Sequence, residues 1–159
     1  MNEKKGKLLL FFDTEFTDFV DMDLISIGIV SPESHEFYAE NADYNKAWCN
    51  EFVLAEVIPR LEGGQASMTL KLLKITIQNW ISKLLIEYSS VMFIYDYSGD
   101  WQLLKEFLVE YPKILNIEAI QVNLEEDIKD YFKADHSSQH HALLDAKALL
   151  NNYKVKLLE

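Results

Sequence analysis

The feature that most constrains the fold of this chain is an uninterrupted apolar run, Leu8 to Phe12, that ends directly at the acidic triplet Asp13-Thr14-Glu15. An apolar run of this length bounded by charge is typical of a buried strand. Side chains two apart on a strand share one face, so Asp13 and Glu15 are expected to project together. One alternative stays open at this point, in which the strand ends at Phe12 and the acids belong to a turn.

If the strand continues through the acids, their proximity has an electrostatic consequence. Two carboxylates this close resist joint ionisation unless a cation lies between them. Carboxylate oxygens are hard ligands, which Mg²⁺ and Mn²⁺ prefer. The pair Asp13 and Glu15 therefore indicates a divalent metal site.

A third carboxylate, Asp100, stands where a helix is expected to begin. The run Val91 to Tyr95 predicts a strand, a polar turn follows, and residues 101–111 have helical spacing. Asp100 heads the apolar stripe of that helix and is expected to face inward; the stripe contains Leu103, Leu104, Phe107 and Leu108. The alternative is an ordinary acidic residue stabilised by the helix dipole.

The final helix, expected at roughly residues 142–157, places a fourth carboxylate, Asp145, among small and apolar neighbours. The polar stretch before it, residues 133–141, contains three of the four histidines. His141 lies four residues before Asp145 and could pair with it across one helical turn, whereas His140 reaches the same site only from a loop or cap. The alternative is a solvated histidine-rich loop.

Taken together, these residues resemble the DEDDh branch of the 3′-to-5′ exonuclease superfamily, over most of the chain. Its three motifs are an Asp-x-Glu at the end of the first strand, an Asp entering a helix after the fourth strand, and His-x4-Asp. They are matched here by Asp13 and Glu15, by Asp100, and by His140 with Asp145. The sister branch has Tyr-x3-Asp, and position 141 is His, so the resemblance gives the role of general base to His140.

The Asp-Thr-Glu-Phe start and the expected strand Leu24 to Val30 are similar to a family of small bacterial exoribonucleases that includes a mycobacterial enzyme related to RNase T. This resemblance implies an RNase H-like fold, two Mg²⁺ ions for which Mn²⁺ can substitute, and removal of nucleotides from the 3′ end of single-stranded RNA or short oligonucleotides. The chain lacks the basic segments that RNase T uses on its substrates, so no specific RNA target is implied.

Phosphodiester hydrolysis by two metal ions assigns a role to each residue of the set. Asp13 is expected to bridge the ions, Glu15 and Asp145 to hold the ion on the nucleophile side, and Asp100 to orient the other through water. His140 would accept the proton of the attacking water, because an unperturbed imidazole titrates at about 6.5 and is neutral at working pH.

Substrate contacts are expected close to the first motif, from Thr14, Phe16 and Thr17. Phe16 and Phe19 are candidates to stack on the terminal base, although packing in the core explains them equally well. The polar residues 134–139 predict a mobile lid that orders when metal and a 3′-terminal nucleotide bind and so delivers His140.

Length and composition predict one globular domain over residues 1–159, and the order of its elements predicts an α/β domain. The family resemblance implies that its sheet is an RNase H-like mixed five-stranded sheet flanked by helices. A single cysteine, Cys49, excludes an internal disulfide and a Cys-rich zinc site, and indicates a cytoplasmic setting. The apolar run before Asp13 is too short for a signal peptide or membrane span. A net charge of −11 disfavours an extended grip on a long polyanion.

The order of the elements follows from hydrophobic periodicity and turn residues. The chain is expected to contain a hairpin of Leu24–Val30 with 36–39, helices over 47–57 and 70–88, an edge strand over 119–122 and a helix over 124–132.

Other functions remain open at this level. A phosphodiesterase for dinucleotides, or an exonuclease for single-stranded DNA, would use the same catalytic residues. A non-catalytic nucleic-acid-binding or scaffold module is a further alternative, although such a protein does not need to bury four acids. The sequence leaves open whether the chain forms a homodimer.

Overall fold

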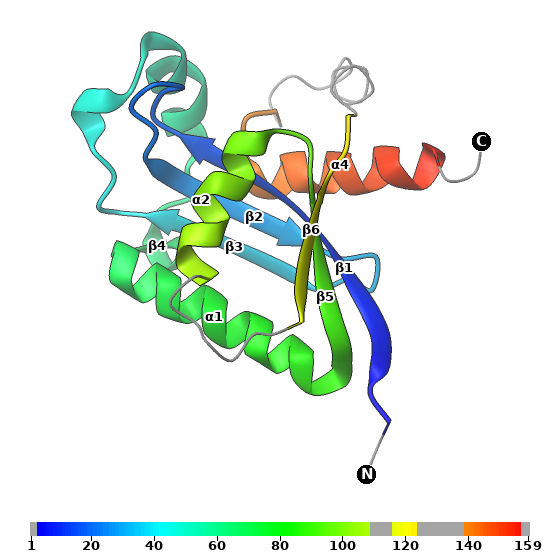
Figure 1. Ribbon diagram of the computed structural model, residues 1–159. Coiled ribbons are helices and arrows are strands. Elements are labelled where there is room, and N and C mark those ends of the chain that lie inside the picture. The colour runs from blue at the N-terminus through cyan, green and yellow to red at the C-terminus, as the bar shows by residue number, and fades with distance from the viewer. Residues whose placement is uncertain (1–2, 109–115, 124–138, 157–159) are drawn as a thin grey trace.

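The structure, a computed structural model, describes residues 3–108, 116–123 and 139–156 of the 159-residue chain (Figure 1). Six strands form one mixed sheet in the order β4-β3-β2-β1-β5-β6. The strands are β1 (Lys5–Phe16), β2 (Leu24–Val30), β3 (Glu36–Asn41), β4 (Ser67–Met68), β5 (Tyr88–Tyr95) and β6 (Ile117–Gln121). The prediction of a mixed sheet flanked by helices is confirmed, with one more strand than expected.

The pairing of the strands places β1 at the centre of the sheet. It pairs antiparallel with β2 and parallel with β5. The expected hairpin is confirmed, because β2 pairs antiparallel with β3. The outer strands β4 and β6 are parallel to their neighbours. Since β1 and β5 run in the same direction, their carboxyl ends lie at one edge of the sheet.

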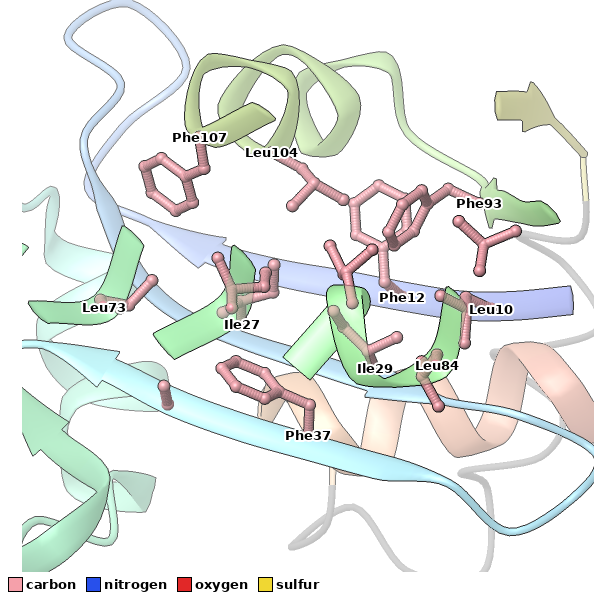
Figure 2. Packing of buried hydrophobic residues seen from close by; sticks show 14 of the residues in the cluster. Leu10, Phe12, Ile27, Ile29, Phe37, Leu73, Leu84, Phe93, Leu104 and Phe107 are labelled. Carbon is pink, nitrogen blue, oxygen red and sulfur yellow. The ribbon is translucent and has the colours of Figure 1, made fainter. Parts of the chain in front are cut away.

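Helices cover both faces of the sheet (Figure 1). They are α1 (Leu70–Glu87), α2 (Ser98–Leu108) and α4 (Ala142–Lys156). Helix α1 begins at Thr69, whose side chain accepts a hydrogen bond from the Leu72 N–H, and it buries an apolar stripe against the sheet. Between this helix, α2 and the sheet lies the larger core, in which Leu10, Phe12 and Phe93 are fully buried (Figure 2).

The opposite face of the sheet packs against α4. Phe11 of β1, Val30 of β2 and Ile94 of β5 contact Ala146 and Leu149 of this helix. Along β1, residues therefore alternate between the two cores, as the period of a strand requires. This alternation decides which face each acidic side chain reaches.

The predicted helix over 47–57 is wrong in detail. The structure has a 3₁₀ turn at Lys46–Trp48, a π-helical turn at Val53–Val57 and a further 3₁₀ turn at Ile58–Arg60. The Asn50 side chain accepts the Val53 N–H, so it starts a new helical segment instead of continuing the first. The helix expected over 124–132 lies outside the described residues.

Candidate active site

Strand β1 does not end with its apolar run but continues through Phe16, which excludes a turn at the acids. Phe12 lies in the core under α1 and α2, and Thr14 on the same side bonds to Asp100 of α2. Asp13 and Glu15 consequently share the other face, that of α4. The expectation that the two carboxylates project together is confirmed.

A glycine brings α4 onto the sheet beside these acids. Gly28 of β2 pairs with Asp13 of β1. A Cβ atom at Gly28 would lie 2.3 Å from backbone atoms of Leu143, so only a residue without a side chain permits this approach. The first turns of α4 thereby lie directly over the sheet, and Asp145 comes to the same cleft as Asp13.

Asp100 enters the site from the first turn of α2, as expected, and its side chain is 1% exposed. Its Oδ1 accepts hydrogen bonds from the Thr14 hydroxyl at 2.5 Å and the Thr14 N–H at 3.3 Å. Its Oδ2 is buried and has no hydrogen-bond partner. One oxygen therefore fixes the carboxylate and the other is left to bind a ligand.

His140 lies just before α4 with a left-handed backbone, φ 67°. Its N–H donates to Asp145 Oδ2 at 3.0 Å, and its ring meets the Phe52 ring edge-on at 4.9 Å between centroids. Burial lowers the pKa of His140, and the positive charge of Arg60 lowers it further. Both effects favour the neutral imidazole.

These residues line one cleft of about 450 Å³ at the carboxyl ends of β1 and β5. Within it, two groups each have their ligand atoms within 4.8 Å of one another: Asp13 with Asp96 and Asp100, and Glu15 with His140 and Asp145. The cleft is lined by Asp13, Thr14, Glu15, Phe16, Phe19, Asp96, Tyr97, Asp100, Asn123, His140 and Asp145.

Burial, and after it the concentration of negative charge, raises the pKa values of the acids. Burial and the charges of Asp100 and Asp145 raise the pKa of Asp13 well above its usual range, and burial beside Asp145 does the same for Glu15. Burial raises the pKa of Asp100 to about 8 and that of Asp145 to about 7. Such a cluster is stable in its charged form only when cations compensate it.

The donor set fits divalent metal ions. Asp100 Oδ2 and Asp145 Oδ1 are buried oxygens without a hydrogen-bond partner, and buried polar atoms of this kind call for an explanation. Four carboxylates supply the hard oxygen ligands that Mg²⁺ and Mn²⁺ prefer. The residues present are therefore suited to hold such ions, in two groups of ligands within the cleft.

Asp96 is a member of the cluster that the sequence analysis did not assign. It directly follows β5, two residues beyond Ile94, which pairs with Phe11 of β1, and Asp13 lies two residues beyond Phe11. The parallel register therefore carries Asp96 to the side of Asp13. Part of the signal was present in the sequence, because Asp96 directly follows an apolar run in the same way as Asp13.

The residues expected to contact substrate lie in different surroundings. Phe16 lines the cleft and stacks on the Tyr97 ring at 5.9 Å, and Phe19 beside it is 67% exposed, which rules out a core position for Phe19. Thr14 lines the cleft but uses its hydroxyl to hold Asp100. Thr17 is fully buried, and its hydroxyl bonds within the loop after β1 instead, to Asp21 and Asp23.

A second, more apolar cavity of about 430 Å³ adjoins the acidic cleft. It shares Glu15, Phe16, Phe19 and His140 with the cleft and continues between Phe52 and its neighbours. Arg60, the only arginine of the chain, forms an ion pair with Glu56 at 3.1 Å. Its positive charge partly offsets the rise in pKa that burial causes in Glu15 and Asp145. Of the lid expected over 134–139, only Gln139 belongs to the described residues, so that prediction lies outside them.

Comparison with known proteins identifies the fold. Among solved structures, the chain is similar to that of cell-death related nuclease 4 (CRN-4), with a TM-score of 0.59 and 16% sequence identity. The alignment covers 94% of this chain and 64% of CRN-4, so the chain spans less than two thirds of that nuclease. The expected RNase H-like α/β fold is confirmed. No protein-family model matches the sequence, and neither does any curated protein.

None of the helices in the described part of the chain has the length and apolar character needed to cross a membrane.

Proposed function

We propose that this protein is a metal-dependent 3′-to-5′ exonuclease of the DEDDh type that hydrolyses single-stranded RNA, related to the small bacterial exoribonucleases. The observation that carries the proposal is the meeting of Asp13, Glu15, Asp100 and Asp145 with His140 in one cleft. The four acids come from three elements and lie together in the cleft despite their electrostatic repulsion, with Asp100 buried and the other three half-buried. The likeness in fold to a protein named as a nuclease supports it.

The two groups of ligands suggest how the metal ions would be held. Asp13 and Asp100, with Asp96 beside them, would hold one ion, while Glu15 and Asp145 would hold the other. Divalent ions bound there would supply the positive charge that makes water nucleophilic and that stabilises the phosphoryl oxygens. Mg²⁺ is the proposed cofactor and Mn²⁺ its substitute.

His140 is proposed as the general base that accepts the proton of the attacking water. Its lowered pKa keeps the ring neutral near pH 7, as a base requires. Its position is fixed by the bond from its N–H to Asp145 and by the edge of Phe52. The first contact fixes the backbone of His140 and the second fixes its ring, which lines the acidic cleft.

The lining of the cleft suggests short, single-stranded 3′ ends as substrates. None of the described residues that line it is a lysine or an arginine, so few phosphates can be neutralised by side chains. The exposed ring of Phe19 and the pair Phe16 and Tyr97 offer flat apolar surfaces for a terminal base. Affinity would thus come from bound metal and the last nucleotides.

The test is hydrolysis of a short 5′-labelled single-stranded RNA and its DNA counterpart with Mg²⁺, Mn²⁺ or a chelator. Wild type is expected to shorten the RNA from its 3′ end only with metal. Asp13→Asn should abolish the reaction, and His140→Ala should lower kcat by about 10²- to 10⁴-fold while metal still binds. Asp21→Asn, which removes an exposed acid from the nearby loop, is the matched control.

The same lining favours one second candidate, a phosphodiesterase for dinucleotides, because a cleft without described lysine or arginine suits a substrate with few phosphates. Cleavage of dinucleotides but not of longer strands would select it. Preferential cleavage of the DNA strand would assign a DNA exonuclease. Metal binding without cleavage of any of these substrates would contradict catalysis and leave the scaffold alternative.

A further inference from the structure

The residue after the proposed base, His141, begins helix α4 and yet turns its side chain away from the helix. Its carbonyl accepts the Asp145 N–H at 2.9 Å, so His141 occupies the N-cap position. His141 is a member of neither of the two ligand groups found among the described residues. It extends instead toward β3 and the loop that follows Arg60, and its side chain is only 10% exposed.

Two contacts hold the His141 ring. It stacks on the ring of Tyr38 with 4.5 Å between centroids and 22° between planes. Its Nε2 lies 3.1 Å from Glu62 Oε1. The first contact ties the start of α4 to strand β3, and the second ties it to the loop after Arg60.

Both partners are in turn fixed by a buried carboxylate. Glu40 of β3 is 3% exposed and accepts a hydrogen bond from the Tyr38 hydroxyl at 2.7 Å. It also accepts the N–H groups of Glu62, at 2.5 Å, and of Gly63, at 3.1 Å. Gly63 has φ 64°, which a glycine adopts without strain, so the loop turns tightly around this carboxylate. His141 therefore rests on rigid supports.

The conformation of His140 needs such support. A left-handed backbone is costly for a residue other than glycine and persists only where its surroundings enforce it. One restraint is the hydrogen bond from the His140 N–H to the Asp145 carboxylate. His141, the next residue, restrains the backbone of His140 from the other side, because the His141 side chain is held by contacts with both Tyr38 and Glu62.

We propose that His141 is a positioning residue, which holds the general base His140 at the cleft through Tyr38 and Glu62. The inference rests on the proposed hydrolytic function. The proposal implies that the loop bearing Glu62, which is far from His140 in the sequence, contributes to turnover. A displacement of a catalytic group by about 1 Å can cost about 10²-fold in rate.

The experiment compares His141→Phe, Glu62→Ala and the double variant with wild type. Phenylalanine keeps a ring to stack on Tyr38 but cannot bond to Glu62. Each single variant is expected to lower kcat by about 10- to 100-fold, with KM for the single-stranded RNA and Mn²⁺ affinity unchanged. The double variant should lose no more than either single variant, because both remove the same contact. Glu62 is 56% exposed, so its replacement leaves the core intact.

Lys147→Met is the matched control. Lys147 also ties α4 to β3, by an ion pair with Glu36 at 2.9 Å, but it lies beyond Asp145. Lys147→Met should keep the wild-type kcat. His141→Gln restores a donor toward Glu62 and should recover most of the kcat that His141→Phe loses. An equal loss in Lys147→Met, or additive losses in the double variant, would overturn the proposal and indicate a general weakening of α4. Wild-type turnover in Glu62→Ala would also overturn it and leave the proposed hydrolysis standing, whereas a wild type without activity would contradict the hydrolysis itself.

Discussion

In two carboxylates of the cleft, one oxygen accepts hydrogen bonds that fix the side chain, and the other oxygen is buried without a hydrogen-bond partner. In Asp100, Oδ1 accepts two bonds from Thr14, and in Asp145, Oδ2 accepts the His140 N–H. The remaining oxygens, Asp100 Oδ2 and Asp145 Oδ1, have no partner. Buried oxygens without a partner lower the free energy of unfolding, and they are expected where the binding of a ligand offsets this loss.

The raised pKa values predict how the metal-free protein responds to pH. An unfolded Asp has a pKa of about 3.9, whereas burial raises the pKa of folded Asp100 to about 8, so between these values the folded state holds the extra proton. Stability from this group is therefore full below about pH 4 and is lost as the pH rises toward 8. With a chelator present, the Tm should fall between pH 5 and pH 8.

Asp100→Asn should flatten this fall and raise the Tm at pH 8 by at least about 3 °C, the shift that roughly 1 kcal/mol gives in a chain of this size. Mn²⁺ at pH 8 should raise the Tm of wild type but stabilise the variant less. Asp21→Asn, which lacks the burial of Asp100, should keep the wild-type profile. A wild-type Tm that does not fall in this range, or an unchanged profile in Asp100→Asn, would contradict the assignment.

At the scale of elements, the site is assembled where the carboxyl ends of β1 and β5 meet the starts of α2 and α4. The closeness of α4 to the sheet depends on Gly28, since a Cβ atom there would lie 2.3 Å from the Leu143 backbone. This helix carries Asp145 and begins beside His140. The geometry of the cleft is therefore sensitive to a residue that has no functional group.

Gly28→Ala is expected to destabilise the protein by about 1–3 kcal/mol, as overpacking of a core does, and to weaken Mn²⁺ binding by displacing Asp145. Urea denaturation and calorimetric titration with Mn²⁺ measure the two effects. Gly6→Ala is the control, because Gly6 lies in β1 beside β5 with nothing within 4 Å of the added atom, and it should change neither quantity. Wild-type metal affinity in Gly28→Ala would show that α4 does not need this close approach.

The sequence predicts the elements whose periodicity is long and misses those decided by single contacts. The strand before Asp13 and helix α1 follow from buried apolar spacing. Strand β4 has two residues, too few for any pattern, and exists because it pairs with the end of β3. Asp96 joins the site through the β1–β5 register, which a sequence read one strand at a time does not contain.

At the scale of the whole molecule, a net charge of −11 accompanies a cleft whose described lining contains acids, aromatic rings and His140 but no lysine or arginine. Repulsion between such a surface and a polyanion favours binding confined to a few nucleotides. Bound metal would be the main source of positive charge at the site. The dependence of affinity on monovalent salt therefore reports the length of strand that the protein holds.

If the protein contacts about two phosphates, the logarithm of the binding constant should fall with the logarithm of the salt concentration at a slope of about −1.4. Each phosphate on a single strand contributes about −0.7 to this slope. The binding can be measured with His140→Ala and single-stranded RNA at constant Mn²⁺, so that slow turnover does not consume the ligand. Val20, which is 86% exposed and directly follows Phe19 of the cleft lining in the sequence, provides a calibration. Adding Val20→Lys should steepen the slope by about 0.7 if the strand leaves the cleft past this residue. A slope several times steeper in the protein without the added lysine would show that basic side chains elsewhere on the chain hold an extended strand, and would contradict selection for short 3′ ends.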